Sequence, residues 1–110
     1  MLFNLNPTGS TNVTEDTRGP DTSTSVAVTT TASVALAANT ARTNYSVYNV
    51  GNGTVYLREA TTVTAALYKV AIPPGYFWKE DFAGGSRYLG AVSVIGAAAS
   101  TCLVSESSAT

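Results

Sequence analysis

The sequence divides into two unequal parts, and this division constrains the fold more than any other feature. Residues 1–25 are mostly Thr, Ser, Asn, Gly, Pro and charged residues, whereas β-branched residues recur at strand spacing from residue 26 to residue 106. Fixing the backbone of one residue costs about 1–2 kcal/mol, which a polar segment cannot recover by burying its own side chains. We therefore predict an extended N-terminal arm at 1–25, one domain at 26–106 and a polar tail at 107–110.

The arm holds few side chains that can contribute to a core. Its large apolar residues are Met1, Leu2, Phe3, Leu5 and Val13. A neighbouring chain can supply the surface that such a segment lacks, so we expect the arm to become ordered against other proteins. Phe3, Leu5 and Val13 are its candidate contact residues.

Charge is scarce along the chain, and this disfavours several classes of function. Charged residues make up 12% of the sequence and the net charge is −1, against about 25% charged residues in an average domain. The Lys and Arg residues are scattered, which disfavours a nucleic-acid interface built on phosphate contacts. No run of about 18 apolar residues predicts a membrane helix. The first residues also lack the regions of a signal peptide, so we expect synthesis in a cytoplasm.

The side chains that most enzymes and metal centres use are rare. There is no histidine and one cysteine, Cys102, which lies in an apolar alternation typical of a buried thiol. Most zinc sites, the nucleophile systems that need histidine, and an intrachain disulfide are therefore excluded. We expect no enzyme activity, no metal and no cofactor.

The acidic residues of the predicted domain offer only a weak catalytic alternative. They are Glu59, Glu80, Asp81 and Glu106. A glycosidase needs two carboxylates facing each other across a cleft. Glu80 and Asp81 are adjacent and would point to opposite faces of a strand, whereas Glu59 could approach either one. We expect solvated charges at strand ends instead.

Alternating apolar and polar residues predict a series of short strands. The expected strands are Ser25–Thr30, Ser33–Leu36, Thr43–Asn49, Thr54–Glu59, Tyr76–Glu80, Tyr88–Ile95 and Ser100–Ser105. Residues 65–72 fit either a strand or a single helical turn. Pro73-Pro74-Gly75 predicts a sharp turn or a sheet edge. This spacing favours an all-β fold, a small β-sandwich or jelly-roll-like barrel.

The clearest local prediction is a hairpin between Thr43–Asn49 and Thr54–Glu59. Gly51, Asn52 and Gly53 lie between these two strands, and all three tolerate the positive φ angles of hairpin turns. The residues that we expect to face the core from this hairpin are Val47, Val55 and Leu57.

Three consecutive aromatic residues, Tyr76, Phe77 and Trp78, stand out. Strand alternation predicts Tyr76 and Trp78 on one face and Phe77 on the other. Tyr76 and Trp78 would form a sugar-stacking platform in a binding module. The favoured interpretation is that Phe77, together with Tyr76 or Trp78, anchors the core or a subunit interface. Tyr76, Trp78 and Tyr88 are therefore the candidate interface residues of the domain.

The domain resembles small virion proteins of tailed bacteriophages. The matching segments are VAVTTTASVALAAN, NYSVYNVGNGTVYLRE, IPPGYFWKE and YLGAVSVIGAAASTCLVSE. In that group such domains are β-sandwich units of head decoration (cement) proteins, head fibres and tail-associated proteins. The resemblance covers about three-quarters of the chain and carries no catalytic residues.

The resemblance implies a capsid decoration protein on the outer surface of a phage head, located in the virion and made in the host cytoplasm. Its partners would be the major capsid protein and itself, as a homo-oligomer with three subunits at threefold positions. Two alternatives remain: a tail or head-fibre component, and a carbohydrate-binding module that contacts host surface glycans.

Overall fold

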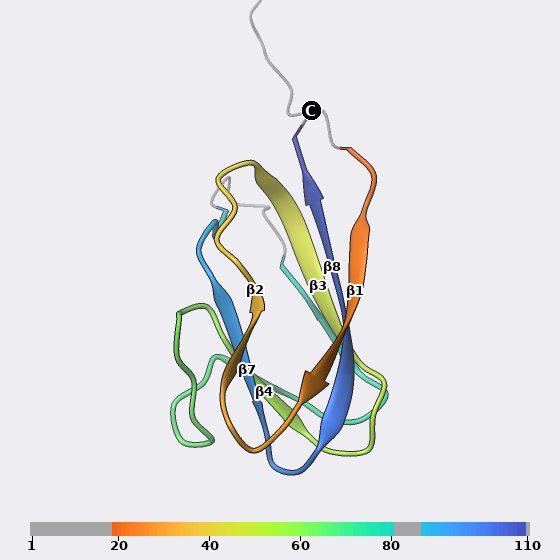
Figure 1. The fold of residues 1–110 in the computed structure, drawn as a ribbon, viewed down its shortest axis with the longest axis vertical. Helices are drawn as coiled ribbons and strands as arrows, with labels where there is room; N and C mark the ends of the chain where they lie inside the picture. The colour runs from red at the N-terminus through yellow and green to blue at the C-terminus, as the bar shows by residue number, and fades with distance from the viewer. Residues whose placement is uncertain (1–18, 81–86, 110) are drawn as a thin grey trace, which may run out of the picture.

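The structure is a computed structural model that describes residues 19–80 and 87–109. Over these residues the chain forms two four-stranded antiparallel sheets that pack together, and no helix (Figure 1). The predicted all-β fold and the β-sandwich are therefore confirmed. No described helix is long and apolar enough to cross a membrane. The predicted contact residues Phe3, Leu5 and Val13 lie outside the described residues.

Each sheet combines strands that are distant in the sequence. The first has the order β1-β8-β3-β6 and the second the order β2-β7-β4-β5. The strands are β1 (Thr22–Val28), β2 (Ser33–Leu36), β3 (Arg42–Asn49), β4 (Val55–Arg58), β5 (Val70–Ile72), β6 (Phe77–Lys79), β7 (Val92–Gly96) and β8 (Ser100–Ser108).

The core lies between the sheets and follows the period of two residues that extended strands impose. On β3, Tyr45 and Val47 point into the core, whereas Tyr48 is exposed. The core cluster consists of Val28, Tyr45, Val47, Val55, Leu57, Ile72, Val92, Val94, Cys102 and Val104. The predicted inward positions of Val47, Val55 and Leu57 and the buried thiol of Cys102 are confirmed.

The predicted hairpin is wrong. β3 belongs to the first sheet, while β4 pairs with β5 and β7 in the second. The chain from Asn49 to Val55 therefore crosses between the sheets. A side chain at Gly51 would overlap Ser100 Oγ and the Thr101 amide nitrogen, so this glycine allows a close approach of the backbone to β8.

The Pro-Gly turn is confirmed. Gly75 has a φ of 84°, and it is the one glycine with a positive φ among the described residues. The amide of Tyr76 donates to the carbonyl of Pro73 at 3.1 Å, which closes the turn. The turn leads directly into β6 and fixes where that strand begins beside β3.

Several strand boundaries differ from the prediction. β1 begins at Thr22, inside the predicted arm, and β8 continues to Ser108, because their ladder hydrogen bonds join backbone groups and do not require apolar side chains. β7 begins only at Val92, because the carbonyls of residues 88 and 90 accept hydrogen bonds from the side chain of Arg42. Residues 65–72 contain a strand only at Val70–Ile72.

We predict that Leu57→Ala destabilises the domain far more than Arg58→Ala does. Leu57 is fully buried in β4, and such truncations cost about 2–5 kcal/mol. Arg58 is partly exposed, and its described side-chain contact is a 3.5 Å hydrogen bond to the carbonyl of Thr62. Thermal unfolding followed by circular dichroism should show a clearly lower Tm for Leu57→Ala alone. Equal Tm values for the two variants would contradict the inward position of Leu57.

Candidate functional site

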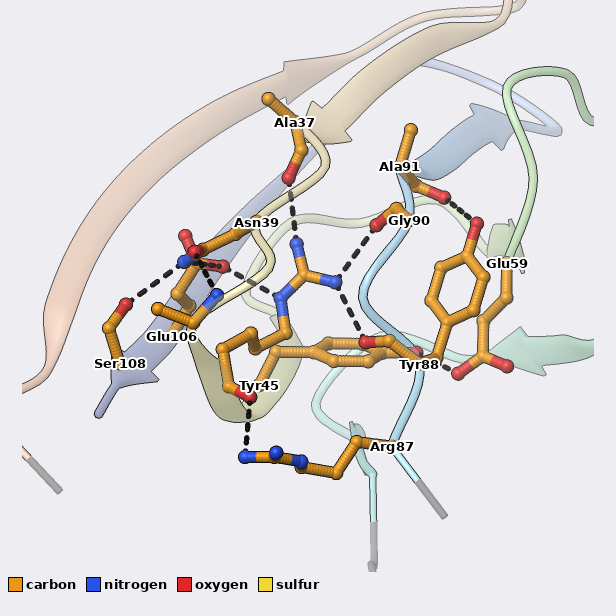
Figure 2. A network of polar contacts seen from close by, with 12 residues as sticks. Ala37, Asn39, Tyr45, Glu59, Arg87, Tyr88, Gly90, Ala91, Glu106 and Ser108 are labelled. Carbon is orange, nitrogen blue, oxygen red and sulfur yellow. Dashed lines mark hydrogen bonds and ion pairs between the residues drawn. The ribbon is translucent and has the colours of Figure 1, made fainter. Parts of the chain in front are cut away.

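The side chain of Arg42 on β3 is fully buried. Figure 2 draws the network of polar contacts around it, with the acceptor residues Ala37, Tyr88, Gly90 and Glu106 labelled. Its Nε donates to Glu106 Oε2 on β8 at 2.7 Å. Nη1 donates to the carbonyls of Tyr88 and Gly90 at 3.1 and 2.9 Å, and Nη2 donates to the carbonyl of Ala37 at 2.8 Å. One guanidinium therefore joins the first sheet to the segments that follow β2 and precede β7.

Neighbouring groups complete the surroundings of this charge. The Asn39 side-chain amide donates to Glu106 Oε2 at 3.2 Å and to Ser108 Oγ at 2.9 Å. The guanidinium carbon of Arg42 lies 5.5 Å from the centroid of the Tyr45 ring. The buried charge thus has a carboxylate partner, carbonyl acceptors and an aromatic neighbour, which offset the cost of removing it from water.

A second set of polar contacts lies farther along β3. The hydroxyl of Tyr45 donates to Glu59 Oε2 at 2.6 Å, and Trp78 Nε1 donates to that hydroxyl at 3.4 Å. Glu59 also forms an ion pair with Lys69, with Oε1 and Nζ 3.4 Å apart. Burial, reinforced by the hydrogen bond to Glu59, raises the pKa of Tyr45 well above its ordinary value.

Asn49 makes a third polar connection at the far end of β3, where it is fully buried. Its side-chain nitrogen donates to the carbonyls of Gly53 and Ile72 at 2.7 and 2.8 Å. Its side-chain oxygen accepts from the Gly51 amide at 3.2 Å and from Ser100 Oγ at 2.8 Å. This one amide therefore holds the crossing segment and β5 against the first sheet.

Arg42, Tyr45 and Asn49 therefore occupy the start, middle and end of one strand, and each binds groups outside its own sheet. Local sequence patterns did not reveal this arrangement. Arg42 and Glu106 are 64 residues apart in the chain, and a single sequence carries no signal for such a pair. The arrangement fixes the two sheets relative to each other.

Two of the carboxylates that the sequence offered for catalysis are engaged in contacts within the fold and do not face each other across a cleft. Glu59 and Glu106 are bound by Tyr45 and Arg42, respectively, in contacts that hold the fold. Asp81 lies outside the described residues. Among residues 19–80 and 87–109, no three His, Cys, Asp or Glu side chains gather as metal ligands. Burial raises the pKa of the Cys102 thiol to about 11.

The outer face of the first sheet carries an exposed apolar row. Tyr48 on β3 lies opposite Leu103 on β8 and Phe77 on β6 in the strand register. Their exposed fractions are 42%, 41% and 66%, respectively. We call Leu103, Tyr48 and Phe77 the apolar row. Ser25 on β1, opposite Leu103, ends it with a small polar side chain.

A polar row lies beside the apolar row, two residues along each strand. It consists of Ser23, Ser105, Ser46 and Lys79, which lie opposite one another across the four strands. A depression of about 190 Å³ opens at this row and is lined by Asp21, Asn44, Tyr45, Ser46, Lys79 and Ser105. Asp21 and Lys79, at opposite edges of the sheet, give it one charge of each sign.

The aromatic cluster differs from the prediction. Trp78 packs against the core, opposite buried Val47, so it does not form a platform with Tyr76, which is exposed at 66%. Phe77, expected in the core or at a subunit interface, does not enter the core and points outwards, because the register of β6 places it opposite Tyr48. Tyr88 packs against the core, and its hydroxyl donates to the carbonyl of Ala91 at 2.6 Å. Interface roles for Tyr76, Trp78 and Tyr88 stay predictions.

Comparisons with known proteins identify no family for this chain. No family model matches it, and no curated protein matches it. One solved structure, a disulfide-linked pilus of Bacillus endospore appendages, is similar with a TM-score of 0.49 and 17% sequence identity. The match covers 91% of this chain and 100% of that chain, and it is too weak to carry an argument.

We predict that Arg42→Lys lowers the free energy of unfolding by about 1–3 kcal/mol, the usual cost of leaving buried hydrogen-bonding groups without a partner. A lysine carries three donors on a single nitrogen and cannot reproduce the planar fork that serves four acceptors. Arg58→Lys is the matched control and should change stability by less than about 1 kcal/mol. Urea unfolding measures both, and near-equal midpoints would contradict the role of Arg42.

The stability of the fold should decrease in alkaline solution. Burial is the main reason that the pKa values of Tyr45, Tyr88 and Cys102 are raised in the folded chain. Above about pH 8.5 for a thiol and about pH 10 for a phenol, the unfolded chain loses these protons while the folded chain retains them. The free energy of unfolding then falls by up to about 1.4 kcal/mol per pH unit for each group.

Urea midpoints measured from pH 7 to pH 11 test this expectation. We expect a plateau near neutral pH followed by a decline. Tyr45→Phe should be less stable at pH 7, because Glu59 loses a partner, but its decline should be shallower. An identical decline in both proteins would show that Tyr45 ionises as easily in the folded chain as in the unfolded one.

Proposed function

We propose that this chain is a structural subunit of a virus particle, a decoration protein on the outer head of a tailed phage. The observation that carries the proposal is how the domain distributes its side chains. The polar groups of Arg42, Tyr45 and Asn49 join the two sheets inside, whereas aromatic side chains stand on the outer face of the first sheet. Such a distribution suits a rigid body that works through contacts with other proteins.

In this role the part of the predicted arm that precedes β1 lies across neighbouring copies of the major capsid protein and contacts them through Phe3, Leu5 and Val13. Binding that occurs only on the assembled lattice stabilises the lattice by mass action. Several copies joined in a homo-oligomer add avidity, because each bound domain raises the local concentration of the next. The resemblance implies three copies.

The test is to locate the chain on particles of the phage that encodes it. Antibodies raised against the purified protein are applied to intact particles and viewed by electron microscopy. Label over the head supports the proposal, and label on the tail or on fibres supports the alternative component instead. Particles that contain no such chain would overturn both.

We predict that the triple variant Phe3→Ser, Leu5→Ser, Val13→Ser binds purified heads at least tenfold more weakly than the native chain. Its Tm should be unchanged, because we expect the arm to bind neighbouring proteins and not the core of its own domain. Substitution is preferable to deleting residues 1–25, because Thr22 to Ser25 belong to β1. Co-sedimentation with heads measures the effect, with Thr8→Ser as the control. Undiminished binding of the triple variant would contradict the arm's role.

A further inference from the structure

We propose that the outer face of the first sheet is a two-fold interface on which a second copy of this chain packs sheet against sheet. The inference rests on the proposed function only in treating the chain as an assembling structural subunit. The contact itself is argued from the residues of the face. It also replaces the expectation of three subunits with a pair, because this face is complementary to itself.

The side chains of the apolar row differ in size from one edge of the sheet to the other. This difference determines which two-fold axis lets two copies pack closely. The β6 end carries Phe77, the β1 end carries only Ser25, and Tyr48 and Leu103 lie between them. A two-fold axis parallel to the strands and midway between the copies places β6 of each copy over β1 of the other. Phe77 then faces Ser25 of the second copy, and Tyr48 faces its Leu103. The phenyl ring of Phe77 then meets the small Ser25, and the two middle apolar side chains meet each other, so no gap is left at either edge.

A two-fold axis across the strands gives a poorer fit. It would place Phe77 over Phe77 at one edge and Ser25 over Ser25 at the other. The separation that suits two phenyl rings would leave a gap between two serines, and unfilled space at an interface forfeits dispersion contacts. The row is therefore complementary to itself only when the axis runs along the strands.

The charges on the face agree with the same axis. Lys79 lies on β6 and Asp21 precedes β1, so they stand at opposite edges of the sheet, and both line the depression beside the polar row. No ion pair of Lys79 occurs within the described residues. The two-fold operation brings Lys79 of each copy towards Asp21 of the other, which forms two equivalent contacts between opposite charges. An isologous interface repeats every contact in this way.

The mass of the full chain in solution tests this proposal. Sedimentation equilibrium from about 1 µM to about 300 µM should show a mass that rises from 11.3 kDa towards twice that value. A mass of three chains, or of one chain throughout, would overturn the two-fold contact.

Two sets of variants locate the contact. Phe77→Thr should weaken self-association at least tenfold, whereas Leu67→Thr, which changes another exposed apolar residue between β4 and β5, should not. Lys79→Asp and Asp21→Lys should each weaken the pair, and the double exchange should restore it. Circular dichroism confirms that each variant is folded. Unchanged association of Phe77→Thr would overturn the proposal. Asp21 accepts a hydrogen bond from Ser107, so Asp21→Lys can fail to fold. In that case the result for Phe77→Thr alone decides.

One further outcome distinguishes a second copy of the chain from a glycan as the molecule that binds this face. If the chain stays monomeric and is retarded on a polysaccharide gel in a way that Phe77→Thr abolishes, the face binds glycans and the proposal is overturned. Failure of the interface and failure of the proposed function remain distinguishable. A monomeric chain that labels phage heads would keep the function and remove only the contact between copies.

Discussion

Arg42 places a positive charge inside the sandwich, away from water, and the rest of the fold is arranged around it. An isolated buried charge is destabilising by several kcal/mol, so each acceptor must be present at once. Glu106 comes from the first sheet, and the carbonyls of Ala37, Tyr88 and Gly90 come from the segments beside the second. The guanidinium is satisfied only when both sheets and both segments are in position, which favours one arrangement over all looser ones.

The arrangement of β3 also explains why the outer face of the first sheet is available for contacts with other proteins. Like Arg42, Tyr45 and Asn49 on β3 point inwards and form hydrogen bonds with groups in or beside the second sheet. The alternating residues point outwards and include Tyr48, which joins Leu103 and Phe77 in the apolar row. A rigid sandwich with aromatic groups on one outer sheet is suited to assembly. This links the interior contacts to the proposed role in a particle.

Sequence patterns correctly predicted the features that depend on residues close together in the chain, such as core positions and turns. Alternation placed Val47 and Leu57 in the core, and the turn at Gly75 followed from its composition. Patterns failed where the outcome depends on distant partners. The glycines after Asn49 indicated a turn but could not show that the next strand enters the other sheet. The faces of Phe77 and Trp78 depend on the register of β6 beside β3, which their own spacing does not determine.

Hydrogen exchange at the side chain of Arg42, followed by NMR, tests the central claim most directly. If the guanidinium is buried and bonded to Glu106, its Nε proton should exchange as slowly as the amide of Val47 in the core, because both need the domain to open. The Nε proton of Arg58, which is partly exposed, provides the comparison within the same molecule. Exchange at Arg42 as fast as at Arg58 would contradict the account.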